Sequence, residues 1–172
     1  ESLKAVQYVK DAIASKFAIK DLGEACILVG IHLEKCEDGS WSLDQKHYIN
    51  DIMQLYSINN LKCNETPMQP NLRLTSNLEE ESEALRRPVD SCLYRQVVGK
   101  LMYLMVCTRP DISFSVSVLS RYVNEPKEKH WRCMIQLLKY INSTKQLTLR
   151  YPCQSSIVLT GYSDSDHAGD HE

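Results

Sequence analysis

The chain has 172 residues, of which 43% are hydrophobic and 24% are charged, and its formal net charge at pH 7 is −2. This composition is typical of a folded globular protein, and the length suffices for one ordinary domain or for parts of two. No apolar run approaches the roughly 18 residues of a membrane-spanning helix, so we expect no membrane partner. The chain opens on Glu1 without a signal peptide and closes on Asp-His-Glu, which indicates an intracellular protein with cut ends.

The chain contains seven cysteines, and none of them forms a Cys-x-x-Cys pair. Their odd number and irregular spacing argue against a disulfide framework and against a zinc ribbon. We therefore expect free thiols, most of them small core residues.

Charge is distributed unevenly along the chain. Residues 91–150 carry ten Lys and Arg against three Asp and Glu, whereas residues 151–172 carry four acidic side chains and no Lys or Arg. A basic middle and an acidic end fit a surface that faces nucleic acid, followed by a metal-binding part. Chance clustering on solvated faces is the other explanation.

The first 56 residues are predicted to form a helix, a hairpin and a second helix. Apolar spacing predicts a helix from Leu3 to about Phe17, and alternation predicts one strand from Ala25 to Lys35. Asp38-Gly39 marks a hairpin turn, and Trp41 to Leu43 is the returning strand. Asp44 is placed to cap a helix with four inward side chains, Tyr48, Ile49, Ile52 and Met53.

Residues 57–90 show no sustained periodicity and hold three prolines and the acidic run Glu79-Glu80-Glu81. We interpret them as an extended, partly disordered connector.

Three helices and two strands are predicted beyond the connector. The helices run from about Ser91 to Val106, from Pro110 through Val123, and from about Lys127 to Asn142. Strands follow at Leu147 to Tyr151 and at Ile157 to Asp164. The fold class is therefore α+β.

Several segments resemble, in the same order, the Pol polyproteins of copia-type retrotransposons where reverse transcriptase runs into ribonuclease H. The segments are Lys20-Asp21-Leu22-Gly23-Glu24, Leu28-Val29-Gly30-Ile31, Thr66-Pro67-Met68, Tyr94 to Leu104, Thr108-Arg109-Pro110-Asp111-Ile112, His130-Trp131, Leu138-Lys139-Tyr140 and Gly161-Tyr162-Ser163-Asp164-Ser165-Asp166. Each segment alone is weak, but the ordered set covers nearly the whole chain and is specific. Ser143 and His167 depart from the family, which usually has Gly and Trp there.

The resemblance implies four parts. Residues 1–56 would be the end of a reverse-transcriptase palm with a primer-grip-like hairpin, and residues 57–90 the connector. Residues 91–145 would be a helical thumb or connection, and residues 146–172 the first strands of a truncated ribonuclease H-like domain. Those strands would lack their sheet partners, so we expect that part to be poorly ordered or to expose a strand edge.

Four residues are predicted to contact nucleic acid. The resemblance makes Gly30 part of the primer grip, where a residue without Cβ lets the backbone approach the primer end. Lys129, Arg132 and Lys139 lie on the polar face of the last predicted helix and would contact phosphates. The alternatives are a hairpin glycine with only a packing role and a solvated amphipathic helix face.

The resemblance makes Asp164 the first catalytic carboxylate of ribonuclease H. Asp166 shares its strand face and is the weaker second residue. Both are also predicted metal ligands, but only together with carboxylates that this sequence lacks. The alternative is a turn rich in Asp and Ser.

The polymerase carboxylates themselves are absent, because no Tyr-x-Asp-Asp occurs. We therefore expect Mg²⁺ in the intact parent enzyme, no cofactor for this chain alone, and no activity of this chain alone. The expected partners are an RNA–DNA hybrid or template-primer and the remainder of the Pol polyprotein. The parent would act in a cytoplasmic virus-like particle or in the nucleus. The alternatives are a non-catalytic nucleic-acid-binding module and an inert transposon remnant.

Overall fold

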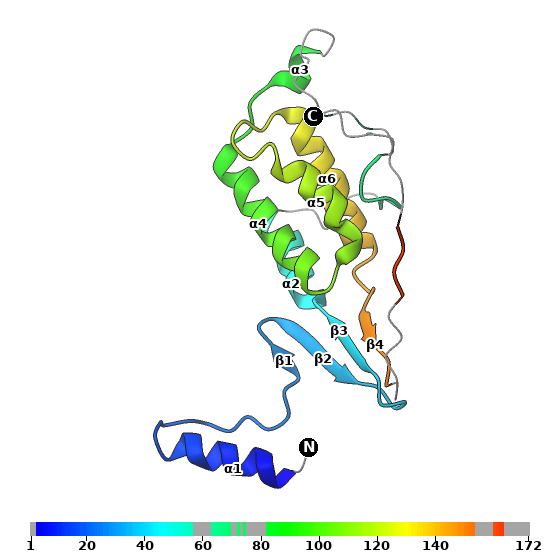
Figure 1. Ribbon diagram of the computed structural model, residues 1–172. Coiled ribbons are helices and arrows are strands. Elements are labelled where there is room, and N and C mark those ends of the chain that lie inside the picture. The colour runs from blue at the N-terminus through cyan, green and yellow to red at the C-terminus, as the bar shows by residue number, and fades with distance from the viewer. Residues whose placement is uncertain are drawn as a thin grey trace.

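The structure is a computed structural model that describes residues 3–56, 63–69, 72, 74, 82–153 and 160–163. Helices and strands are both present, and the strands form a single four-stranded antiparallel sheet. The predicted α+β class is confirmed at this level. Figure 1 shows the sheet between the first helix and a compact group of helices within residues 46–55 and 91–143, which we call the helical unit. Among the described residues, no helix is long and apolar enough to cross a membrane.

The sheet has the order β1-β2-β3-β4. Its strands are β1 (Ile27–Leu28), β2 (Ile31–Lys35), β3 (Trp41–Asp44) and β4 (Leu149–Tyr151). The prediction of one strand from Ala25 to Lys35 is wrong, because Val29 and Gly30 have φ angles of 51° and 78°. Two successive positive φ angles form the tight turn that folds β1 back onto β2. The predicted turn at Asp38-Gly39 is confirmed, and it joins β2 to β3.

The last strand, β4, comes from far along the chain and pairs with β3, with Leu149 opposite Leu43. Arg150 also donates to Asp38 Oδ2 (2.7 Å) and to Ser40 Oγ (2.9 Å), which fastens β4 to the β2–β3 turn. The expectation that the last strands lack sheet partners is therefore wrong for β4, because the partner comes from this chain. Of the other predicted strand, at Ile157 to Asp164, residues 160–163 are described and do not form a strand, and the remaining four lie outside the described residues.

The predicted helices are confirmed with small shifts at their ends. They are α1 (Leu3–Ala14), α2 (Lys46–Leu55), α4 (Ser91–Cys107), the short 3-10 turn η1 (Pro110–Ile112), α5 (Ser113–Ser120) and α6 (Glu128–Ser143). A short helix in the connector, α3 (Glu83–Arg86), was not predicted. The cap of α2 is shifted by one residue from the prediction: Gln45 is the N-cap residue, and Asp44 just before it accepts from the Lys46 backbone N–H through Oδ1 (3.0 Å). Val123 lies beyond the end of α5.

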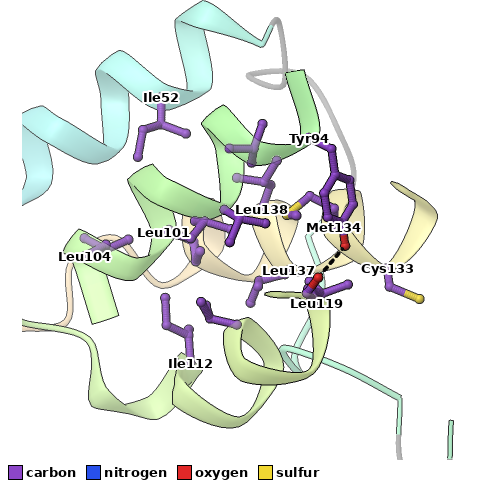
Figure 2. Packing of buried hydrophobic residues seen from close by; sticks show 14 of the residues in the cluster. Ile52, Tyr94, Leu101, Leu104, Ile112, Leu119, Cys133, Met134, Leu137 and Leu138 are labelled. Atoms are coloured by element: carbon purple, nitrogen blue, oxygen red, sulfur yellow. Dashed lines mark hydrogen bonds between the residues drawn. The ribbon is translucent and has the colours of Figure 1, made fainter. Parts of the chain in front are cut away.

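The hydrophobic core lies inside the helical unit, where α2, α4, α5 and α6 meet (Figure 2). Its buried side chains include Ile52 from α2, Leu101 from α4, Leu119 from α5 and Leu138 from α6. The buried Tyr94 hydroxyl donates to the Leu119 carbonyl (2.9 Å), so the polar end of this large ring is satisfied. Burial raises the pKa of Tyr94, so the ring stays neutral. The seven cysteines are free thiols, but only Cys133 is buried, and the expectation that most are core residues is wrong.

A second set of buried contacts surrounds Arg109, whose side chain is only 2% exposed. The guanidinium donates to both carboxylate oxygens of Asp111 (2.9 and 2.8 Å) and to Thr144 Oγ1 (2.6 Å) and carbonyl (3.2 Å). Tyr140 donates to Asp111 Oδ2 (2.9 Å), and its ring lies 5.6 Å from the guanidinium carbon. Burial acts to raise the pKa of Asp111, but the bonds and charge of Arg109 outweigh it and hold that pKa below its usual range.

We predict that Arg109→Leu lowers the free energy of unfolding by about 3 kcal/mol, because it strands the Asp111 carboxylate and the Thr144 carbonyl. Chemical denaturation of the purified chain measures this. The matched control is Arg132→Leu, whose side chain is 63% exposed. The control should change stability by only about 0.5 kcal/mol. Equal losses in the two variants would show that the buried contacts of Arg109 contribute nothing special.

Candidate nucleic-acid interface

The tip of the β1–β2 hairpin projects into solvent. Val29 is 76% exposed and Leu28 is 57% exposed. Gly30 stands at φ 78°, and a Cβ built on it would meet no atom of the described chain within 4 Å. The turn conformation is thus sufficient reason for Gly at position 30. Contact of Gly30 with a primer strand stays a prediction, and the open space above the residue leaves room for it.

Val29 is the strained residue of this turn. Its φ of 51° lies in the left-handed region, which a β-branched side chain rarely adopts. The Tyr103 hydroxyl, from α4, donates to the Val29 carbonyl. Tyr103 is in turn held edge-on by the Tyr48 ring, with centroids 5.4 Å apart, and Tyr48 donates to the Lys100 carbonyl (3.3 Å). The hairpin tip is therefore tied to the middle of α4, although 74 residues separate the two in sequence.

The outer face of α4 continues the surface from the hairpin tip. Arg95, Gln96 and Gly99 are exposed along it, followed by Met102 (46% exposed) and Val106 (76% exposed). Gly99 is unusual here, because glycine within a helix is about 1 kcal/mol less favourable than alanine. A Cβ at Gly99 would meet no atom of the described chain within 4 Å. Packing against the described residues therefore does not explain why position 99 lacks a side chain.

The three basic residues predicted on α6 lie in different environments. Lys129 is 6% exposed and buried in the helical unit, so its prediction as part of an exposed polar face is wrong. Arg132 is exposed and pairs with Glu128 one turn earlier (3.3 Å). Lys139 is half-buried. Lys129 lies at the corner between α5 and α6, where it lines a pocket together with His130 and Tyr122, whose rings stack with centroids 4.0 Å apart.

A pocket of about 260 Å³ lies at the corner between α5 and α6. Leu74 and Tyr122 line the pocket. Three cationic side chains, Arg121, Lys127 and Lys129, and the acidic Glu125 line it as well. Arg121 and Lys129 have interactions within the chain. The pocket therefore does not present a set of uncommitted positive charges.

The predicted catalytic and metal-binding residues, Asp164 and Asp166, lie outside the described residues. Within the part of the chain that the structure describes, no group of three His, Cys, Asp or Glu side chains is arranged to hold a metal ion. A small polar cluster lies at the end of β3. The Oδ2 atom of Asp44 lies 3.1 Å from His32 Nδ1 and 3.6 Å from Lys46 Nζ. Burial acts to raise the pKa of Asp44, but the backbone bond from Lys46 and the contact with His32 hold it below its usual range.

Sequence comparison finds relatives over nearly the whole chain, and most of them are named as transposon proteins. The chain is 34% identical over 169 residues to the retrovirus-related Pol polyprotein from transposon TNT 1-94 of Nicotiana tabacum. It is 30% identical over 171 residues to a transposon Ty5-1 protein of Saccharomyces cerevisiae. It is also 30% identical over 157 residues to an uncharacterized mitochondrial protein of Arabidopsis thaliana.

These matches cover 94%, 99% and 91% of this chain, but only 12%, 54% and 62% of the respective relatives. They define the class as a segment of a retrotransposon polyprotein. The chain belongs to the Pol polyproteins of copia-type retrotransposons. No protein-family model matches the sequence, and no solved structure matches it.

The segments that carry the family resemblance have structural roles in this chain. Arg109 and Asp111 form the buried ion pair, and Thr108 donates to Gln45 Oε1 (2.9 Å) in the interior. Tyr94 anchors the core. The sequence alone did not single out Gly99 and Tyr103, although both lie in one of the matching segments. A glycine in the middle of a strong helical pattern was the available signal.

We predict that Tyr103→Phe loosens the hairpin tip without unfolding the chain. Loss of one hydrogen bond lowers the free energy of unfolding by about 1 kcal/mol, and the strained turn at Val29 loses its tie to α4. Hydrogen–deuterium exchange should become faster in residues 27–33 and stay unchanged in α6. The control is Tyr8→Phe, at a ring that is 75% exposed on α1. Unchanged exchange in the hairpin would contradict the role assigned to Tyr103.

Proposed function

We propose that this chain is a substrate-holding part of a reverse transcriptase and runs into its ribonuclease H. The hairpin at Val29-Gly30 acts as the primer grip, and the helical unit acts as the thumb or connection. The family membership and the order of the matching segments support this proposal. The ligand is an RNA–DNA hybrid or template-primer, which proteins recognise through backbone shape and charge.

The single observation that carries the proposal is Gly99. An exposed glycine within a long helix lowers helix stability, and no described neighbour needs the space. Glycine in such a position allows close approach of another backbone. The face around it carries the polar side chains of Arg95 and Gln96, which make long hydrogen bonds within the chain (3.4–3.7 Å), and the exposed apolar side chains of Met102 and Val106. Such a face suits the wide, shallow groove of a hybrid, where sugar edges and base edges are both accessible.

The hydrogen bond from Tyr103 to Val29 joins the hairpin tip to α4. The tip and the exposed face of α4 are therefore the two parts of the proposed binding surface. Arg132 and Lys139 remain proposed phosphate contacts, whereas Lys129 is no longer one because it is buried. In this proposal, the exposed face of α4 contacts the groove of the duplex, and Arg132 and Lys139 on α6 contact its phosphates.

Catalysis would come from outside the described residues. Asp164 and Asp166 are the proposed first ligands of the ribonuclease H metal ions, and Mg²⁺ bound there with further carboxylates would activate water. Two carboxylates do not complete such a site. The proposed role of this chain by itself is therefore binding, with inactivity in both reactions.

We predict opposite effects of Gly99 substitution on stability and on binding. Gly99→Ala should raise the free energy of unfolding by about 1 kcal/mol, because alanine favours the helix. Gly99→Leu should keep the fold and weaken binding of an RNA–DNA hybrid about tenfold, since its side chain occupies the approach space. Fluorescence anisotropy with a labelled hybrid, read beside thermal unfolding, measures both.

The matched control is Ser117→Leu, which places the same leucine side chain on the exposed side of α5. Hybrid affinity should stay unchanged in this variant. Arg132→Ala and Lys139→Ala test the phosphate contacts, because each lost contact lowers the salt dependence of binding by about one ion. Absence of salt-dependent hybrid binding by the unsubstituted chain would refute the proposed function and favour an inert remnant.

We further predict that the purified chain does not cut the RNA strand of a hybrid in the presence of Mg²⁺, because its carboxylate set is incomplete. A gel assay with a labelled RNA strand checks this. The informative comparison is Asp164→Asn. Metal-dependent cleavage that disappears in this variant would contradict the expectation and make the chain an active nuclease.

A further inference from the structure

The two faces of the sheet differ in chemistry. Strand register places residues that are directly opposite each other on the same face. The apolar face carries Leu33, Leu43 and Leu149 in one row across β2, β3 and β4. The polar face carries side chains that form hydrogen bonds, namely His32, Glu34, Ser42, Asp44 and Arg150.

His32 and Asp44 form a bonded pair on the polar face. The Nδ1 atom of His32 lies 3.1 Å from Asp44 Oδ2. The Asp44 side chain is only 5% exposed, and its other oxygen accepts from the Lys46 backbone N–H (3.0 Å). Burial acts to raise the pKa of Asp44, but the contacts with Lys46 and His32 hold that pKa below its usual range, so the carboxylate is ionised.

This bond determines which ring nitrogen of His32 is available to a ligand. An ionised carboxylate only accepts hydrogen bonds, so Nδ1 carries a proton and donates to Asp44. Nε2 lies on the other edge of the ring, and the side chain is 40% exposed. Nε2 is therefore an acceptor in the neutral ring and a donor in the protonated ring.

The elements around His32 bring few other charges to this face. Glu34 is exposed two residues further along β2, away from the hairpin tip. Arg150 shares the face from β4, but its guanidinium donates to the β2–β3 turn. Strand β1 places the apolar Ile27 opposite His32, and Lys46 Nζ lies 3.6 Å from Asp44 Oδ2.

We propose that His32, positioned by Asp44, donates from Nε2 to a backbone phosphate of bound nucleic acid when its ring is protonated. This proposal rests on the proposed function, in which the tip at Val29-Gly30 contacts the primer strand, and it adds a pH-dependent contact to the same site. His32 follows Gly30 by two residues, which is about 7 Å along an extended strand. A nucleic-acid backbone that contacts the tip therefore brings phosphates close to this face.

The test measures hybrid affinity of the full chain by fluorescence anisotropy between about pH 5.5 and about pH 8, the range in which histidine side chains change charge. The affinity of the unsubstituted chain should rise about fivefold toward the acidic end, because the protonated ring gains a bond to a charged phosphate. His32→Gln should remove this rise. The matched control is His47→Gln, at an exposed histidine of α2, which should keep it.

Asp44→Asn tests the positioning role through the pH profile. The amide oxygen can still accept from the Lys46 backbone, and the amide NH₂ group then donates to His32 Nδ1. The neutral ring of His32 would carry its proton on Nε2 and donate to the phosphate without further protonation. Affinity at the alkaline end should therefore equal or exceed that of the unsubstituted chain, and the rise should disappear. A purely structural loss would instead lower affinity throughout the range.

Thermal unfolding shows whether each variant folds, and His32→Gln, at a partly exposed side chain, decides alone where Asp44→Asn is unstable. An equal rise in the unsubstituted chain and in His32→Gln would overturn the proposal and leave hybrid binding, and with it the proposed function, intact. A rise that a folded Asp44→Asn variant retains would also overturn it. Absence of hybrid binding at every pH would overturn this proposal together with the proposed function.

Discussion

The buried guanidinium of Arg109 is the constraint on which the helical unit depends. A charge removed from water must be matched by fixed partners, since transfer without them is strongly unfavourable. Asp111, Thr144 and Tyr140 supply those partners from two separate parts of the chain. Arg109 follows the end of α4, Asp111 lies in the turn before α5, and the other two residues lie at the end of α6. Satisfying one cation thus fixes how three helices meet.

The same corner also connects α2 to the rest of the unit. Thr108 precedes Arg109 and donates to Gln45, the residue immediately before α2. The adjacent Asp44 belongs both to the start of α2 and to the end of β3. The sheet is consequently attached to the helical unit at the point where the buried polar contacts are densest. This explains how short strands with few apolar neighbours hold a defined position beside the helices.

Local pattern accounts for much of the fold. Apolar spacing located the helices, and in α4 the apolar side chains that recur at this spacing, Tyr94, Val97, Leu101 and Leu104, are all buried. Asp38-Gly39 located a hairpin because that dipeptide accommodates a tight turn. Such predictions succeed where the cause lies within a few residues of the effect.

Predictions failed where the cause is distant in sequence. Val29 reads as a strand residue, and its left-handed conformation is maintained with help from Tyr103 on a distant helix. β4 pairs with β3 more than a hundred residues earlier, a register that no local pattern encodes. Lys129 shares a helical face with Arg132 and Lys139 by spacing alone, but tertiary packing at the α5–α6 corner buries it. Gly30, Arg132 and Lys139 of the candidate interface could be predicted from the sequence, whereas the open space at Gly99 is a property of the folded surface.

The contrast between the two halves of the molecule bears on what the chain is for. The helical unit closes its core and gives the buried Arg109 and Tyr94 side chains hydrogen-bond partners, so its sequence motifs describe a stable support. Among the described residues outside the helical unit, α1 has no buried residue, the apolar face of the sheet contributes nothing to the core, and the hairpin tip carries a strained turn. The strained conformation of Val29 is stabilised by the hydrogen bond that its carbonyl accepts from Tyr103 on α4. The helical unit thus stabilises the position of an exposed hairpin. This arrangement suits the proposed function, in which the hairpin positions a substrate and the catalytic residues lie elsewhere.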